Sequence, residues 1–176
     1  MANKVAMADG IPESHFGSVG RMDDGRSFVL FERQFAHSIE RVWAAITEPD
    51  QLARWFPGFK LELRQGGRFE IWFTGESGEC EGPSHVQGEV TEYDPPKLLQ
   101  CGTIRFELAS IGPHCKLTFS DVLQLDGIRT NAEFSNSVLG GWHRFLDVLD
   151  DALEGRTIDH GIAEYDYSKR EVPGRD

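Results

Sequence analysis

The chain has few of the features that mark secreted, membrane-spanning or nucleic-acid-binding proteins. Three cysteines in 176 residues are a sparse and odd set, which indicates free thiols in a reducing cytoplasm rather than a disulfide framework. No apolar run approaches the roughly 20 residues of a membrane span, and the N-terminus lacks the basic-then-apolar order of a signal peptide. The net charge is −11 without a Lys/Arg cluster, which argues against nucleic acid as a partner. Together these features predict a cytoplasmic protein that neither binds nucleic acid nor inserts into membranes.

The motifs of common hydrolases and nucleotide-binding proteins are also missing. The sequence contains no GxSxG elbow, no HExxH and no Walker loop. Cys80 and His85 lie five residues apart, and His114 and Cys115 stand elsewhere, so the close ligand pairs typical of zinc sites do not occur. The sequence therefore predicts no metal and no organic cofactor, and it assigns no catalytic residue.

Apolar and aromatic residues are plentiful, at 39% hydrophobic with 12 Phe and 4 Trp, and their spacing predicts the fold. Helical spacing predicts two short helices over 39–46 and 47–55 and a long C-terminal helix that stops at Gly155. Alternating or continuous apolar residues predict strands over 27–35, 59–64, 68–73, 86–93, 97–102, 103–110 and 114–122. The expected architecture is α+β with an antiparallel sheet of about seven strands.

No repeat or low-complexity linker divides residues 26–155, which we expect to form a single domain. Residues 1–25 and 156–176 are polar and lack periodicity, so we expect a flexible N-terminal tail and a C-terminal tail.

Two adjacent glycines interrupt the long helix directly before Trp142. Each helical glycine costs about 0.5–1 kcal/mol relative to alanine. On a helical wheel Gly140 and His143 fall away from the apolar stripe, whereas Gly141 lies on it. Two interpretations follow. Gly141 makes room for a neighbouring aromatic side chain such as Trp43 or Phe73 in a filled core, or it thins the helix over a cavity. Periodicity alone favours the filled core, because protein interiors are close-packed.

Three stretches of the chain together resemble one known family. They are SIERVWAAITEPDQLARWF (38–56), GEVTEYDPPKLLQ (88–100) and GGWHRFLDVLDDALEG (140–155). In this order they are similar to the SRPBCC (START-like, birch-pollen-allergen-like) superfamily, in the group named after the activator of the heat-shock-90 chaperone ATPase. The resemblance covers about residues 27–155. It implies a helix-grip fold, in which a curved sheet wraps the long C-terminal helix around an internal apolar cavity, and so favours the second interpretation of Gly141.

The resemblance leaves the function open, because members of this superfamily bind lipids, hormones or polyketides, cyclise polyketides, or stimulate a chaperone ATPase. Our first prediction is the binding of a small hydrophobic or aromatic molecule in the cavity. A polyketide-cyclase or hydrolase-type enzyme and a co-chaperone-like interaction module remain alternatives, and a protein partner or homodimer is left open. The candidate cavity residues are Trp55, Phe56, Phe59, Phe69, Ile71, Phe73, Val86, Gly88, Val90, Leu117, Phe119, Phe134, Val138, Gly141, Trp142 and Phe145.

Polar candidates are few. Arg105 and Glu107 alternate with apolar neighbours and are predicted to face solvent. An enzyme would need an inward acid or base, for which Glu89 or Tyr93 would serve if the strand register were reversed.

The C-terminal end of the long helix is acidic. Negative charge is placed there, where the helix dipole disfavours it, by Asp147, Asp150, Asp151 and Glu154. They indicate either solubility or an acidic docking patch.

Overall fold

The computed structural model describes residues 16–73, 85–123 and 132–156. A single antiparallel sheet of eight strands, in the spatial order β1-β2-β8-β7-β6-β5-β4-β3, forms the body of the fold. The strands are β1 (Ser18–Arg21), β2 (Ser27–Phe35), β3 (Phe59–Leu61), β4 (Arg68–Trp72), β5 (His85–Asp94), β6 (Leu98–Cys101), β7 (Ile104–Ile111) and β8 (His114–Leu123).

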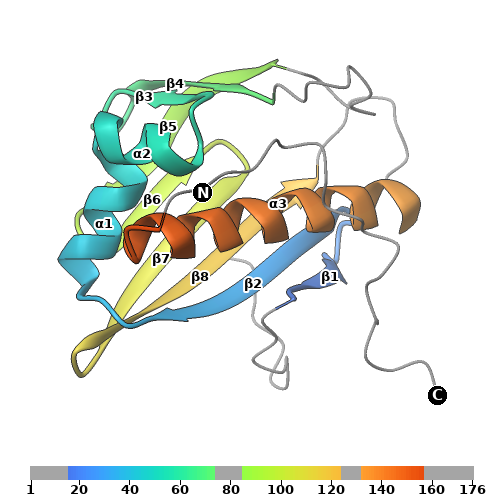
Figure 1. The fold of residues 1–176 in the computed structure, drawn as a ribbon. Coiled ribbons are helices and arrows are strands. Elements are labelled where there is room, and N and C mark those ends of the chain that lie inside the picture. The colour runs from blue at the N-terminus through green and yellow to red at the C-terminus, as the bar shows by residue number, and fades with distance from the viewer. Residues whose placement is uncertain (1–15, 74–84, 124–131, 157–176) are drawn as a thin grey trace.

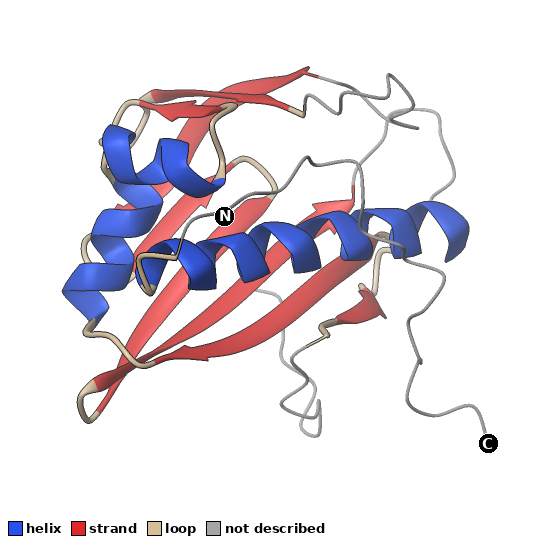
Figure 2. Cartoon of the chain, viewed as in Figure 1, coloured by secondary structure: helices blue, strands red, loops and turns tan. Residues whose placement is uncertain are grey.

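Three helices complete the structure: α1 (Ile39–Thr47), α2 (Pro49–Trp55) and α3 (Ala132–Leu153). The sheet curves, α3 crosses its inner face, and α1 and α2 lie together at one end (Figures 1 and 2). The predicted α+β helix-grip fold is confirmed. The eighth strand, β1, comes from within the segment 1–25 that was predicted to be a tail.

Local sequence explains where the two short helices begin. The Ser38 side chain accepts a hydrogen bond from the backbone N–H of Arg41, which caps the start of α1. Pro49 occupies the first turn of α2, where a missing N–H has no consequence. The prediction that the second short helix begins at residue 47 is wrong. Thr47 is the last residue of α1, its hydroxyl donates to the Trp43 carbonyl at 2.7 Å, and Glu48 takes the cap position.

The inner face of the sheet carries the main core because buried side chains alternate along each strand. On β7, Ile104, Phe106 and Leu108 are buried, and Arg105 lies on the opposite face. There Arg105 forms ion pairs with Glu92 at 2.9 Å and Glu107 at 2.6 Å, as expected for an outward-facing row.

The buried stripe of α3 differs from the predicted one. Its members recur every three or four residues: Ser135, Leu139, Trp142, Leu146, Leu149 and Leu153. Phe134, Val138, Gly141 and Phe145, the other predicted cavity residues of this helix, are half-buried on one flank. The buried stripe is therefore rotated away from these four residues and toward Leu139, Leu146 and Ser135. None of the helices in the described residues is long and apolar enough to cross a membrane.

Candidate functional site

An aromatic cluster joins the end of α2 to the sheet and to α3. The ring centroids of Phe56 and Phe145 lie 4.1 Å apart, and those of Phe119 and Trp142 lie 4.4 Å apart. Phe56 meets Trp142 edge-on, with the rings at 86°. These contacts bring together four of the predicted cavity residues from three elements, and the edge-on Phe56–Trp142 pair has a geometry that aromatic pairs favour.

The predicted cavity residues divide by burial into two groups. Nine are buried: Trp55, Phe56, Phe59, Phe69, Ile71, Val90, Leu117, Phe119 and Trp142. Six are half-buried: Phe73, Val86, Phe134, Val138, Gly141 and Phe145. The remaining residue, Gly88, is exposed, and a Cβ there would lie 2.9 Å from the Phe69 ring, so close packing requires this glycine.

The half-buried residues of α3 share one side of the helix, and Phe73 lies beside them. Its ring is 6.5 Å from that of Phe145 and 6.3 Å from that of Trp142. We call Phe73, Phe134, Val138, Gly141 and Phe145 the open flank. The four apolar side chains of this flank pack against the main core and remain half-buried.

Gly141 lies within the open flank, and the space beside it is empty of described atoms. A Cβ built on Gly141 meets nothing within 4 Å. Neither Trp43 nor Phe73 therefore requires a glycine there, so the filled-core interpretation does not hold for the described residues. Gly140, which was predicted to face away from the core, is buried. Of the two glycines, Gly141 is the one that borders open space.

One ionisable group on the inner face was missed by the sequence analysis. Asp121 of β8 accepts hydrogen bonds from the Thr103 hydroxyl at 2.8 Å and from the Trp142 indole N–H at 3.0 Å. Burial raises the pKa of the Asp121 carboxyl to about 6, and these two hydrogen bonds limit the rise. Alternation could have found it, because Leu117 and Phe119 were both predicted to face inward and Asp121 is the next residue in that row.

The two candidates for an inward acid or base lie on opposite sides of the sheet. Tyr93 packs against the core, and its ring lies 5.9 Å from that of Trp43. Glu89 is exposed and stands opposite Arg68 in the strand register. The register shifts between Val90 and Glu92, and such a bulge changes which residues face inward. Tyr93 therefore faces the core although it is an odd number of residues from buried Val90.

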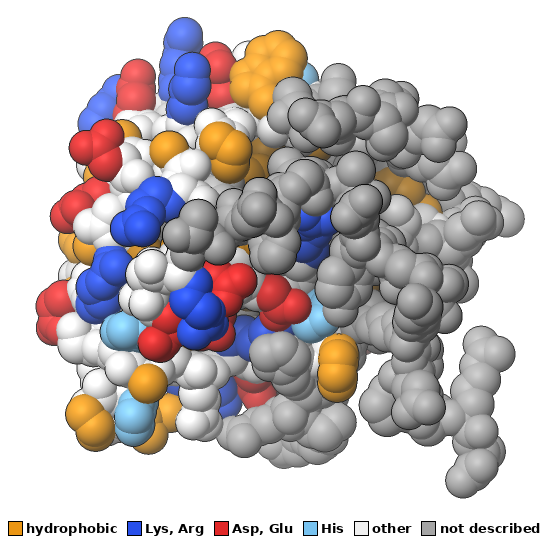
Figure 3. Space-filling model, viewed as in Figure 1, with side chains coloured by type: hydrophobic (Ala, Val, Ile, Leu, Met, Phe, Trp, Pro, Cys, Tyr) orange, Lys and Arg blue, Asp and Glu red, His pale blue; other side chains and the backbone are white. Residues whose placement is uncertain are grey.

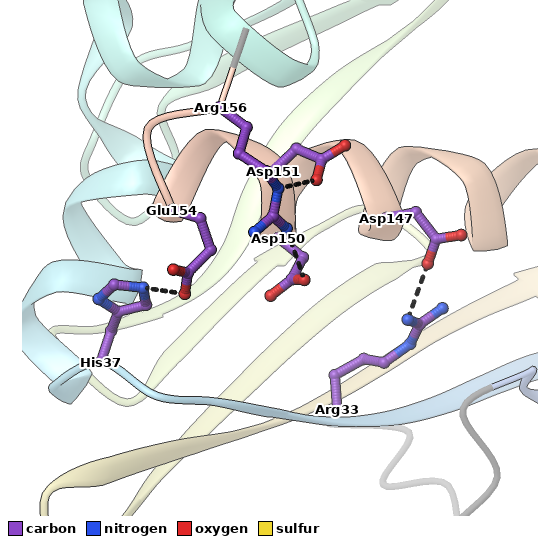
Figure 4. A network of polar contacts seen from close by, with 7 residues as sticks. All are labelled: Arg33, His37, Asp147, Asp150, Asp151, Glu154 and Arg156. Carbon is purple, nitrogen blue, oxygen red and sulfur yellow. Dashed lines mark hydrogen bonds and ion pairs between the residues drawn. The ribbon is translucent and has the colours of Figure 1, made fainter. Parts of the chain in front are cut away.

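The other side of α3 is closed by a polar cluster. His143 was predicted to lie on the surface, and this prediction is wrong, because the residue is 2% exposed. Its Nδ1 lies 2.7 Å from a guanidinium nitrogen of Arg33 on β2. Arg33, itself buried, also donates to Asp147 at 2.9 Å (Figure 4). His143 lies on the side toward which the buried stripe is rotated. The guanidinium group of buried Arg33 needs hydrogen-bond acceptors, and His143 and Asp147 of α3 supply them. We call Arg33, His143 and Asp147 the closed flank.

Arg156 and His37 contact three of the four carboxylates at the acidic end of α3. Arg156 contacts Asp151 at 2.6 Å and Asp150 at 3.3 Å, and His37 contacts Glu154 at 2.9 Å (Figure 4). Acidic and basic side chains stand side by side on this face of the molecule (Figure 3). These contacts offset the unfavourable helix-dipole position, so the four carboxylates do not form an uncompensated acidic patch.

Nothing in the described residues groups three or more His, Cys, Asp or Glu side chains in a way that could hold a metal ion. Burial raises the pKa of the Cys101 thiol to about 12 and that of Cys115 to about 11, so both remain protonated at neutral pH. His85 stacks on Trp72 with ring centroids 3.8 Å apart, and Cys80 lies outside the described residues.

Solved structures of similar fold come from several bacteria. A conserved protein of unknown function from Enterococcus faecalis, EF2215, aligns over 88% of both chains with 22% identity and a TM-score of 0.64. CalU16 from Micromonospora echinospora aligns over 78% of this chain and 84% of its own, with 21% identity and a TM-score of 0.58. DynU16, a protein of the dynemicin biosynthetic locus, aligns over 74% of this chain and 48% of its own, with 21% identity and a TM-score of 0.58.

The structural similarity to these proteins shows a common fold, whereas the family is shown by a match to the sequence itself. No curated protein matched the chain. The family model described as "Activator of Hsp90 ATPase homolog 1-like protein" matches residues 36–154, which span α1 to the end of α3 and include both flanks of that helix except for Arg33. The chain therefore belongs to the Activator of Hsp90 ATPase homolog 1-like family.

Proposed function

We propose that this protein binds a small hydrophobic or aromatic molecule between α3 and the inner face of the sheet, with access beside the open flank. The observation that carries the proposal is Gly141. A helical glycine weakens the helix by about 0.5–1 kcal/mol relative to alanine, and the open space beside Gly141 gives no packing reason for it. A ligand that occupies this space would supply that reason.

The chemistry of the surrounding residues supports an apolar occupant. Phe73 and Phe145 are half-buried at the flank, and Phe56, Phe119 and Trp142 are buried beneath them. Ligand sites are lined mainly by apolar and aromatic side chains with a small number of polar groups, and this composition fits that description. The presence of a similar fold in a biosynthetic-locus protein, DynU16, also favours a small-molecule role.

The co-chaperone alternative, which came from the family resemblance, gains no support from the acidic end of α3. An acidic docking patch would present free carboxylates to a basic partner. Asp147, Asp150, Asp151 and Glu154 each contact a cationic or histidine side chain of this chain instead.

A thermal-shift experiment with methylnaphthalene as the probe tests the proposal. At 100 times its dissociation constant, a ligand adds about 2.7 kcal/mol of stability, which corresponds to roughly 5–10 °C in the melting temperature of a domain this size. Gly141→Leu should fold, because no described atom lies within 4 Å of its Cβ position, and should lose the probe-induced shift.

Asn136→Leu is the matched control, because Asn136 is an exposed residue of the same helix. It introduces the same side chain away from the open flank and should keep the full probe-induced shift. A folded Gly141→Leu variant that binds methylnaphthalene as well as the wild type would overturn the proposal.

A further inference from the structure

Asp121 is a carboxylate on the inner face that contacts no cationic side chain among the described residues. Among the described residues its polar contacts are with the Thr103 hydroxyl and the Trp142 indole, and neither carries a charge. Buried carboxylates are normally paired with a cation or a metal, because removal of a charge from water is unfavourable. Asp147, which is more exposed, contacts the cation Arg33, whereas Asp121 contacts no cation in the described part of the chain.

The carboxylate of Asp121 has hydrogen-bonding capacity left over. Each of its two oxygens accepts one bond, whereas an ionised carboxylate offers about four lone-pair sites. Asp121 is half-buried, although Phe119 and Leu123, its neighbours on the same face of β8, are buried. A further donor that reaches this carboxylate would find an acceptor already oriented by two neighbours.

Asp121 is also placed beside the proposed binding site. Its Oδ2 is bonded to the indole of Trp142, the residue that follows Gly141 and packs on Phe119 and Phe56. An aromatic ring against Trp142 would therefore bring its substituents toward Asp121. We infer that Asp121 is the polar recognition residue of the site and selects an aromatic ligand that carries a hydrogen-bond donor such as a phenolic hydroxyl; this inference rests on the proposed function.

The charge state of Asp121 sets the pH range of this selection. Its pKa of about 6 leaves the carboxylate ionised at pH 7 and above, where it accepts the stronger, charge-assisted hydrogen bond. The groups that face it, Thr103 and Trp142, do not titrate in this range, so the selection should weaken as the pH falls below 6 and Asp121 becomes protonated.

The test compares three probes of similar shape: naphthol, methylnaphthalene and methoxynaphthalene. Naphthol donates a hydrogen bond, methoxynaphthalene has an oxygen that cannot donate, and methylnaphthalene has neither. At pH 8 the wild type should bind naphthol at least about tenfold more tightly than the other two, the preference expected of one hydrogen bond to a charged group. Asp121→Asn should bring the three dissociation constants within about threefold of one another, because its amide oxygen is neutral and already accepts from Trp142.

Thr103→Val serves as the structural control. It removes a partner of Asp121 but leaves the carboxylate in place, so the preference for naphthol should persist. A loss of binding to all three probes alike in Asp121→Asn, or loss of the preference in Thr103→Val, would show that Asp121 acts through the fold and would overturn the inference.

The remaining outcomes separate this inference from the proposed function. If the wild type binds all three probes equally, or methoxynaphthalene as tightly as naphthol, Asp121 does not select donors and only the inference fails. If no probe binds, the proposed function fails and the inference fails with it.

Discussion

The two flanks of α3 are built in opposite ways. On the closed flank, Arg33 reaches from β2 to His143 and Asp147, so the helix is tied to the sheet by hydrogen bonds to buried groups. On the open flank, Phe145 and its neighbours are half-buried, and Gly141 borders space that no described atom fills. One side of the helix is held by polar contacts to the sheet, and the other presents half-buried apolar side chains and the open space beside Gly141.

This difference shows how a single helix can serve both stability and binding. Buried hydrogen bonds to charged groups hold the helix in one position on the sheet. With that position fixed on one side, the other side can leave its apolar surface incompletely packed without loss of the fold. Stability is therefore expected to depend most on the closed flank, and ligand binding most on the open flank.

The largest effect is expected from breaking the closed flank with Arg33→Met. This change removes the Arg33 contacts of buried His143 and of Asp147. Removal of one partner from a buried pair costs several kcal/mol, and because the Asp147 side chain is 36% exposed we expect a loss of about 3 kcal/mol in unfolding free energy. Urea denaturation measures this loss.

Arg156→Met provides the matched control for Arg33→Met. Arg156 also contacts two carboxylates of α3, but its side chain is 53% exposed and water can replace those contacts. It should leave the urea midpoint unchanged. Equal losses in the two variants would show that the closed flank has no special role in stability.

A smaller effect is expected on the pH dependence of the unfolding free energy, through Asp121, which accepts a hydrogen bond from Trp142. Its pKa is raised from 3.8 to about 6 in the folded state, so the folded protein binds a proton more readily than the unfolded chain. Stability from this group is present below pH 4 and is lost as the pH rises through 6. Between pH 4 and 7 the wild type should therefore lose on the order of 2 kcal/mol relative to Asp121→Asn.

The measurement is the difference in unfolding free energy between the two proteins across this pH range. Because the other carboxylates are common to both proteins, their titration cancels in the difference. A difference that stays constant from pH 4 to 7 would show that Asp121 has an ordinary pKa in the folded state.

Local patterns were sufficient to predict most of the fold. The alternation on β7 identified its inner face, and helical spacing correctly identified the start of α1. The strand β1 was missed because it has only four residues and none of them is fully buried, so the sequence shows little apolar alternation there. The end of α1 was misplaced because Thr47 is equally suited to cap a helix and to bond back to its own turn.

The features of the site that were missed depend on contacts distant in sequence. A helical wheel places His143 by its own helix, but its burial follows from Arg33, 110 residues away. The inward position of Tyr93 follows from a bulge that alternation alone does not reveal. Asp121 could have been found by extending the row of Leu117 and Phe119 by one more step, because alternation applies to polar residues as well as apolar ones.

The smallest expected effect separates the two glycines that precede Trp142. Gly141→Ala should raise the unfolding free energy by about 0.5–1 kcal/mol, because alanine favours the helix and its methyl group enters open space. Gly140→Ala brings the same gain in helix propensity at a buried position, where a methyl group must displace its neighbours, so its net gain should be smaller or negative. Urea denaturation of both variants without ligand gives the comparison. If Gly141→Ala destabilises the protein at least as much as Gly140→Ala, the space beside Gly141 is already occupied, and the difference between the two flanks of α3 disappears.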